Sequence, residues 1–575
     1  MAGVVTGRAF HIRRRGRPGY SYVLRHFIPG RRGVKTIDVI SADKLRGGFY
    51  SPPALVRACL DRVAALSSGA AAPLRMFEPS AGDGAFLRGL SGHALSGRVK
   101  EVAAVEIKPG EAAKCRQVLA AAPFAGTVLT GSVLNGARPR PGEYDVAVGN
   151  PPFVRFQFLT DEDRAGALAM ARDSGLTLAG VSNLWIPVLL TALSSLRAGG
   201  SFAFIVPAEC FTGISARSVR TWLIRNVDAL QADLFPPGSF PGVLQEVVVL
   251  SGRLDQSRAH RTAAPLTVVE HLAVIPLSWT HEVLETAPTW TRYLLTPAQL
   301  SALHELTDLP EFHPLAEVAR LRVSTVTGAN EYFSVDDGTL SRYRLDTWAL
   351  PLLPRIRHAT GLCFSQQDHR ELAKQECPRW LLNFGSQSSD PEQVPAAASY
   401  LRYGEQLELH HRYKCRIRDP WYRVPVVQPG RLLLSKRSHK YPRLVLNSAG
   451  AVTTDTIYQG RLTPAFEGRE AGLVAGFHNT GTLLTAEIEG RSFGGGVLEL
   501  VPTEIGRVAV PMLPTFGQSL AHLDKMARSA GPDSTELVQR TDALLAQAIP
   551  KLTPDLLAEL RQARAALLQR RMDRT

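Results

Sequence analysis

The chain has 575 residues, of which 45% are hydrophobic, and its formal net charge is +14 at pH 7. This length corresponds to between two and about four domains, with enough apolar residues for a sizeable core. No apolar run approaches the roughly 18 residues that span a membrane, and none follows the arginines at positions 13 to 15, so we expect neither a membrane span nor a signal peptide.

The first 50 residues carry much of the positive charge. They contain eleven Lys and Arg residues against two Asp residues. A basic excess this local predicts a polyanionic partner, most simply nucleic acid. A generally arginine-rich composition is the alternative, but it does not explain the clustering. We expect residues 1–43 to form a basic N-terminal arm, with a transit peptide as the alternative interpretation.

The cysteines follow no metal-binding or disulfide pattern. No C-x-x-C pair occurs among the six, which are Cys59, Cys115, Cys210, Cys363, Cys377 and Cys415. This scatter argues against a zinc ribbon and against a disulfide framework. We therefore expect no bound metal and a reducing, cytoplasmic location.

The segment 44–258 alternates predicted helices and strands. We expect Ser51 to cap a helix that Pro52 or Pro53 opens, and apolar residues then recur at helical spacing, namely Leu55, Val56, Cys59, Leu60 and Val63. Apolar runs predict strands at 74–77, 102–105, 127–130, 146–148, 201–206, 230–234 and 247–250, and helices at 183–196 and 215–225. This alternation predicts an α/β fold with a doubly wound, Rossmann-like sheet and a right-handed crossover at each step.

A glycine-rich turn follows the first of these strands. It reads Glu78-Pro-Ser-Ala-Gly-Asp-Gly, and Gly82 and Gly84 permit a ligand to approach the backbone closely. It is neither the dinucleotide motif G-x-G-x-x-G nor a P-loop. Glu106 ends the next predicted strand, roughly 20 residues later, where an acidic side chain can accept from ribose hydroxyls. A surface glutamate at a strand end is the alternative.

A second turn, Asn150-Pro-Pro-Phe153, follows the predicted strand 146–148. Gly149 ends the strand, and the two prolines exclude both helix and sheet pairing. We expect a stiff loop at the carboxyl end of the strand, where open α/β sheets bind ligands. The Asn150 amide oxygen and the Pro151 carbonyl are two acceptors, and Phe153 is a flat apolar surface. This combination suits a planar group with an exocyclic amine, such as adenine, although a rigid turn alone would also explain the two prolines.

Beyond about residue 260 the regular alternation disappears. Basic and aromatic side chains interleave at 412–423 and 436–443, as they do where proteins contact phosphates and stack on bases. A solvated basic face is the alternative. The candidates for DNA contact are Arg416, Arg418, Trp421, Tyr422, Lys436, Arg437, Lys440 and Arg443. The tail from 534 to 571 is predicted to be mostly helical.

Taken together, these segments resemble the γ-class DNA adenine-N6 methyltransferases of restriction–modification systems. They occur in the order of that family, over about residues 44 to 255. Residues 48–52 resemble its first motif, Glu78 to Gly84 its S-adenosylmethionine loop, Asn150 to Phe153 its catalytic tetrad, and Phe240 the aromatic position that packs against a flipped base. Segments at 418–422, 442–447 and 492–511 resemble target-recognition regions more loosely.

The resemblance implies a site-specific enzyme that moves a methyl group from S-adenosylmethionine to N6 of an adenine flipped out of duplex DNA. The implied catalytic residues are Asn150, Pro151, Pro152 and Phe153, and the implied base-stacking residues are Phe153 and Phe240. The implied cofactor-binding residues are Tyr50, Ser51, Pro52, Glu78, Pro79, Ser80, Ala81, Gly82, Gly84, Glu106, Ile107, Ser132 and Asn150.

The same resemblance implies the domain organisation and the setting. We expect a catalytic domain at 44–258, a mixed α/β target-recognition domain at 259–530 and C-terminal helices at 531–575. The expected partners are duplex DNA and a separate restriction endonuclease, and the expected state is a monomer in the bacterial cytoplasm, associated with the nucleoid.

One residue departs from the family pattern. Ser132 stands where the family usually has an Asp that binds the adenine amino group of the cofactor. A hydroxyl accepts a hydrogen bond more weakly than a carboxylate, so the departure bears directly on cofactor affinity. The alternatives are a methyltransferase acting on RNA or on a protein glutamine, and a non-catalytic DNA-binding subunit with this fold.

Overall fold

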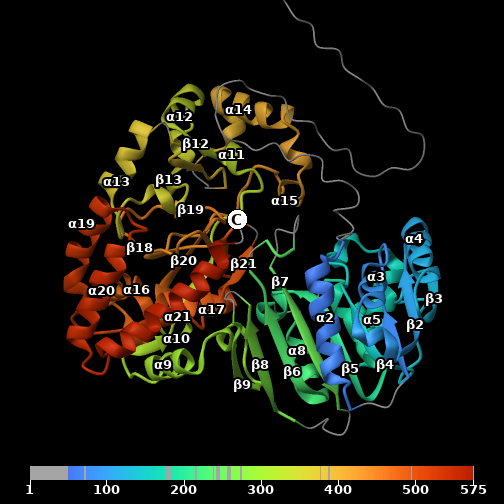
Figure 1. Ribbon diagram of the computed structural model, residues 1–575. Coiled ribbons are helices and arrows are strands. Elements are labelled where there is room, and N and C mark those ends of the chain that lie inside the picture. Colours follow the sequence, from blue (N-terminus) through green and yellow to red (C-terminus); the bar gives the residue numbers. More distant parts are fainter. Residues whose placement is uncertain are drawn as a thin grey trace, which may run out of the picture.

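The computed structural model describes residues 50–573, apart from gaps at 70–72, 177–182, 214–215, 237, 241–245, 256–260, 272–274, 376, 386–388 and 494. The predicted basic arm at 1–43 lies outside the described residues, as do Gly48 and Phe49. Figure 1 shows an N-terminal half built on one large sheet and a C-terminal half of smaller sheets and helices. Among the described residues, no helix is both long enough and apolar enough to cross a bilayer.

The large sheet comprises nine strands within the described part of the chain, in the order β3-β2-β1-β4-β5-β7-β6-β8-β9. Its strands are β1 (Leu74–Glu78), β2 (Val99–Glu106), β3 (Ala125–Thr130), β4 (Tyr144–Gly149), β5 (Leu196–Pro207), β6 (Val227–Leu234), β7 (Val247–Leu254), β8 (Ala263–Glu270) and β9 (Leu277–Leu284). β4 is almost continuously buried, and β5 is buried from Gly200 to Pro207, as expected for strands covered on both faces. Each strand predicted at 74–250 is confirmed, with somewhat wider bounds.

Helices cover both faces of this sheet. They are α2 (Pro53–Leu66), α3 (Ala85–Ser91), α4 (Pro109–Ala120), α5 (Asp161–Asp173), α6 (Trp185–Ser194), α7 (Glu209–Thr212) and α8 (Arg217–Asn226). Successive strand residues join different cores, because side chains alternate across a strand. Val146 and Val148 pack in the cluster that contains α2 and α3, whereas Ala147 packs in the cluster that contains α5, α6 and α8. The doubly wound arrangement is therefore confirmed.

The strand directions correct one expectation. β3, β2, β1, β4 and β5 pair in parallel, but β7 runs antiparallel to both β5 and β6. β7 returns beside β6, the strand that precedes it, so the predicted parallel crossover at each step does not extend to β7. The strand order reverses at β1, and the switch point between β1 and β4 is where such sheets bind ligands.

The C-terminal half is a mixed α/β assembly. A five-stranded sheet within the described residues contains β11 (Ala319–Val323), β20 (Ile457–Leu462), β16 (Leu432–Ser435), β18 (Leu444–Asn447) and β14 (Cys363–Phe364). A four-stranded sheet within the described residues contains β12 (Ser334–Val335), β15 (Trp380–Leu382), β13 (Ala349–Leu353) and β19 (Val452–Thr453). A three-stranded sheet contains β17 (Arg437–Ser438), β22 (Val497–Glu499) and β21 (Arg491–Phe493). β10 (Phe312–Pro314) pairs with β23 (Ala509–Pro511).

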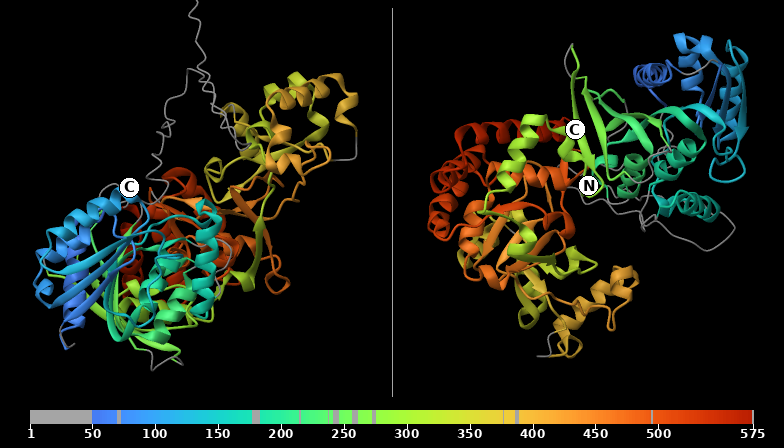
Figure 2. Two further views of the ribbon diagram at one scale, coloured as in Figure 1. Left: turned by 90° about the vertical axis from the view of Figure 1, so that its right-hand side faces the viewer. Right: turned by 90° about the horizontal axis from the view of Figure 1, so that it is seen from below.

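Helices surround these sheets and extend one lobe. α11 (Asn330–Phe333), α12 (Asp337–Tyr343), α14 (Pro395–Gln406) and α15 (Tyr413–Arg416) belong to a lobe that projects from the rest of the half, drawn in yellow to orange in Figure 2. The remaining helices include α9 (Pro297–Thr307), α16 (Glu470–Phe477), α17 (Thr480–Glu489), α19 (Leu520–Ala530), α20 (Thr535–Ala548) and α21 (Pro554–Met572). The predicted helical tail is confirmed as α20 and α21.

The last helix, α21, forms ion pairs with both halves of the protein. Arg571 of α21 is buried and forms a bidentate ion pair with Glu487 of α17, at 2.6 and 2.8 Å. Its neighbour Arg570 forms ion pairs with Glu246, which directly precedes β7, and with Glu270 at the end of β8. The boundary predicted at 258 falls within the large sheet, between β7 and β8, and that division of the chain stays a prediction.

Candidate active site at the carboxyl edge of the sheet

The glycine-rich turn connects β1 to α3 at the switch point. Gly82 and Gly84 have φ of 55° and 86°, a left-handed conformation that glycine adopts without strain. Glu78 at the end of β1 is 1% exposed, and burial together with the charge of Glu106 raises its pKa well above the ordinary value. Among the described residues, no hydrogen-bond partner reaches its buried Oε2 atom. A buried oxygen of this kind is suited to a ligand that donates to it.

Glu106 and the glycine-rich turn are joined directly. The Gly82 N–H donates to Glu106 Oε2 at 2.8 Å, and the Lys108 N–H donates to Oε1 at 2.8 Å. The backbone of the turn also bonds to β2, through the Ala81 N–H and the Val105 carbonyl at 2.9 Å. The structure therefore brings together the two acidic residues and the turn that were singled out from the sequence.

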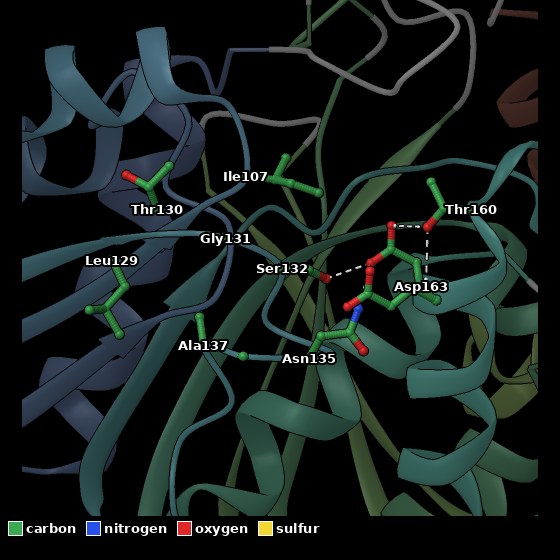
Figure 3. Close-up of a pocket in the computed structure, with 11 residues that line it drawn as sticks. Ile107, Leu129, Thr130, Gly131, Ser132, Asn135, Ala137, Thr160 and Asp163 are labelled. Carbon is green, nitrogen blue, oxygen red and sulfur yellow. Dashed lines mark hydrogen bonds between the residues drawn. The ribbon is translucent and has the colours of Figure 1, made fainter.

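A cavity of about 490 Å³ opens beside Glu106, at the ends of β2 and β3. Ile107 and Leu129, both about half exposed, form apolar parts of its wall. Polar side chains face them from the loop after β3 and from the start of α5 (Figure 3). The full set of lining residues is Ile107, Leu129, Thr130, Gly131, Ser132, Asn135, Gly136, Ala137, Thr160, Glu162 and Asp163.

The tetrad begins immediately after β4, as predicted. The Asn150 carbonyl accepts a hydrogen bond from Ser80 Oγ at 3.1 Å, and Asn150 Nδ2 donates to Ser51 Oγ at 3.2 Å. Ser51 is therefore not the helix cap that the sequence suggested, since Pro52 occupies the N-cap position of α2. Three distant segments meet at the Asn150 residue.

The two candidate base-stacking residues lie in one apolar cluster. Phe240 is 6% exposed and packs among residues of β4, β5 and β7, and Phe153 is partly buried against the same cluster. Tyr50, a candidate cofactor residue, is 58% exposed. Pro79, within the glycine-rich turn, is buried. The geometry thus collects most of the expected site along one edge of the sheet.

The candidate DNA contacts divide into exposed and internal residues. Arg416, Arg437 and Lys440 are exposed, and Lys436 is half-buried. Arg437 forms an ion pair with Glu499 at 2.6 Å while its side chain stays 64% exposed. These cationic side chains are accessible to a polyanion.

The remaining four residues are buried or half-buried, and contact between them and DNA stays a prediction. Arg443 is 3% exposed, and its guanidinium donates to the carbonyls of Ile356, Ala359 and Gly361. Arg418 donates to two carbonyls, those of Val326 and Thr327, both at 2.7 Å. The buried Tyr422 hydroxyl donates to Glu392, and Trp421 packs on Tyr332. A segment rich in Arg and aromatic residues does not reveal which of these side chains will be held inside the protein by hydrogen bonds to main-chain carbonyls.

Sequence reasoning missed Asp163, which the fold brings beside Ser132. Ser132 Oγ donates to Asp163 Oδ1 at 2.7 Å, and Asn135 Nδ2 donates to the same oxygen at 3.2 Å. The only local signal is Thr160 followed by an acid three residues later, a helix-capping pattern. The contact with Ser132 depends on how α5 packs against the loop after β3.

Two family models match the chain. The Eco57I restriction-modification methylase model matches residues 129–235, which include the tetrad, and the model of the C-terminal domain of Type II methyltransferase M.Eco57I matches residues 287–546. The fold is similar to that of the Type IIL restriction-modification enzyme MmeI, solved in complex with DNA. That likeness has a TM-score of 0.55 and 13% identity, and covers 92% of this chain and 77% of the other.

Two curated relatives are Type II methyltransferases. M.AccI of Acinetobacter calcoaceticus is 24% identical over 317 residues, which cover 53% of this chain and 57% of that protein. M.XamI of Xanthomonas campestris pv. amaranthicola is 23% identical over 488 residues, which cover 81% of this chain and 85% of that protein. The match thus spans little more than half of M.AccI and most of M.XamI. Both family models, matched in order along one polypeptide, and both curated relatives therefore support a restriction–modification DNA methyltransferase.

Proposed function

We propose that the chain is a site-specific DNA methyltransferase that transfers a methyl group from S-adenosylmethionine to N6 of adenine, as the modification enzyme of a restriction–modification system. The observation that carries the proposal is the position of Asn150-Pro-Pro-Phe153. It follows β4 at the switch point of the sheet, and its Asn150 donates a hydrogen bond to Ser51 and accepts one from Ser80, which ties it to the expected cofactor segments.

The residues present fit this cofactor. The unpartnered oxygen of Glu78 would accept from its amino group, and Glu106 would accept from its ribose, because a carboxylate offers about four acceptor sites and each of its oxygens already accepts one N–H. The cavity beside Ile107 has a volume within the usual range of small-molecule sites. When bound, S-adenosylmethionine supplies a methyl group on a positively charged sulfur, ready for displacement.

The chain's own contribution to the reaction is orientation. Asn150 Oδ1 and the Pro151 carbonyl would accept the two N6 hydrogens of adenine, which directs the nitrogen lone pair out of the ring. Phe153 would stack on the base and Phe240 would hold its other side or edge. Adenine leaves the duplex at a cost of a few kcal/mol. Direct in-line transfer then needs positioning and electrostatic stabilisation, and no covalent enzyme intermediate.

DNA would be held through the exposed basic residues of the C-terminal half. Arg416, Lys436, Arg437 and Lys440 are the candidates that remain accessible. We propose that they contact phosphates and set the position of the duplex. Action as a monomer, with a separate restriction endonuclease in the same system, completes the proposal.

The test is single-molecule sequencing of DNA from cells that express the chain, scored for N6-methyladenine, with Asn150→Ala as the control. We expect methylated adenine at one sequence motif and none in the control, which should still bind S-adenosylmethionine. Equal methylation by the Asn150→Ala variant would contradict the assignment of the tetrad. Methyl groups found in RNA or in a protein glutamine would show that the substrate is not DNA. Cofactor binding without any methylated product would favour a non-catalytic subunit.

A further inference from the structure

We propose that Asp163, at the start of α5, supplies the carboxylate that accepts a hydrogen bond from the exocyclic amine of the cofactor's adenine, in place of an acid at position 132. This inference rests on the proposed function, because it concerns how the same site recognises S-adenosylmethionine.

The first support is the position of the cavity relative to Glu106. The Gly131 N–H donates to the Glu106 carbonyl at 3.0 Å, so the end of β3 lies directly beside the expected ribose-binding residue. A nucleoside whose ribose contacts Glu106 would lay its base over the exposed Ile107 and into the cavity. Ser132 and Asp163 line that cavity, and Figure 3 shows their side chains turned toward each other.

The second support is the hydrogen-bond inventory of the two residues. Ser132 Oγ donates its single proton to Asp163 Oδ1 at 2.7 Å and accepts from the Leu134 N–H at 3.4 Å. Asp163 Oδ2 accepts from Thr160 Oγ at 3.0 Å, and a carboxylate oxygen accommodates a further donor. A hydrogen bond to an ionised acceptor is roughly twice as strong as one to a hydroxyl. Asp163 is therefore the stronger acceptor in this cavity, and Ser132 holds it in place.

A purely structural role for Asp163 makes a different prediction. Its backbone N–H satisfies the Thr160 cap at 3.1 Å, and its carboxylate ties α5 to the loop after β3 through Ser132 and Asn135. If this were its whole role, its removal would weaken all nucleoside ligands alike. It would not change the preference for an amine over an oxygen on the purine ring.

The experiment compares two ligands by calorimetry on the full chain. The first is S-adenosylhomocysteine, and the second is its inosine counterpart, in which oxygen replaces the 6-amino group. We expect the wild-type chain to prefer the amine by about ten- to hundredfold, the range of a hydrogen bond to a charged group. Asp163→Ala should lose most of this preference. Asp163→Asn should reduce or invert it, because the new amide can donate to the 6-oxo group.

Two variants serve as controls. Asp161→Asn removes a neighbouring charge from the same helix turn, and the Asp161 side chain is fully exposed and paired with Arg164, so it should keep the wild-type preference. Ser132→Ala should weaken both ligands while the preference persists. The inference would be overturned if both Asp163 variants kept the wild-type preference for the amine. It would also be overturned if Ser132→Ala lost that preference while the Asp163 variants kept it. If wild-type protein binds neither ligand, the proposed function itself fails, which is a separate result.

Discussion

The side-chain amide nitrogen of Asn150 donates a hydrogen bond to the hydroxyl oxygen of Ser51 over 3.2 Å. The two residues are 99 positions apart, one before α2 and the other after β4. The contact fixes which way the Asn150 amide points, with its oxygen directed away from Ser51. It joins a segment expected to bind the cofactor to the residue expected to orient the target base.

Ser51→Ala should therefore slow methyl transfer more than it weakens cofactor binding. Loss of one neutral hydrogen bond predicts a rate about two- to tenfold lower. Single-turnover methylation and calorimetric titration with S-adenosylmethionine measure the two effects separately. Ser68→Ala, an exposed serine just beyond the other end of α2, is the matched control. An unchanged rate with weaker cofactor binding would contradict this role of Ser51.

Glu78 should make the stability of the ligand-free protein depend on pH. Burial and the charge of Glu106 raise its pKa well above 4.5, so the folded state binds the proton more tightly than the unfolded state. The contribution of Glu78 to the free energy of unfolding should be greatest below about pH 4.5 and fall as pH rises toward the raised pKa. Each rise of one in pKa corresponds to about 1.4 kcal/mol.

The Glu78→Gln variant tests this relationship. Chemical denaturation from pH 4 to pH 8 should show wild type losing stability relative to the variant as pH increases. The same variant should bind S-adenosylmethionine more weakly, because the amide lacks the negative charge. A constant difference in stability across this range would show that Glu78 does not titrate in the way its burial indicates.

Arg443 and Arg437 should behave as opposites, although both are basic residues of one short segment. Arg443→Ala leaves three carbonyl oxygens without their donor, so we expect a loss of about 2 to 4 kcal/mol of unfolding free energy. Arg437→Ala should cost less, about 1 kcal/mol, because the Arg437 side chain is 64% exposed and its buried partner Glu499 keeps Lys436 within 4.0 Å. DNA titrations at several salt concentrations should show a shallower salt dependence for Arg437→Ala. A steep loss of stability in Arg437→Ala would contradict the assignment.

The ion pair between Arg571 and Glu487 should be essential for docking α21. Both side chains are less than 5% exposed, and Arg571→Met leaves the Glu487 carboxylate buried without its partner. We expect a loss of about 3 to 5 kcal/mol by urea denaturation. The double variant Arg571→Met with Glu487→Leu should recover most of the loss, because no buried charge is left. Failure of the double variant to recover would indicate that the other contacts of Arg571 dominate.

Local sequence patterns predicted the N-terminal half well, because its signals are local. Apolar runs ending in glycine or acidic residues predicted β1, β2 and β4, and the Pro-Pro pair predicted a loop after β4. The prediction that Ser51 caps a helix was wrong, because the hydrogen-bond partner of Ser51 is distant in the sequence. Its hydroxyl could serve either the adjacent helix or a distant partner, and the choice of Asn150 depends on how β4 and α2 pack.

The sequence by itself determined β1 to β7 of the large sheet, the order of the motifs along it, and the chemistry that Glu78, Glu106 and Asn150 offer, whereas β8 and β9 were not predicted. These properties follow from side-chain periodicity and from the backbone conformations and hydrogen bonds that glycine and proline permit or exclude. Only the tertiary structure decided that Arg443 lies inside and Arg437 outside, and that Asp163 meets Ser132. Burial and side-chain contacts across 31 positions depend on packing between elements, which no local pattern of residues encodes.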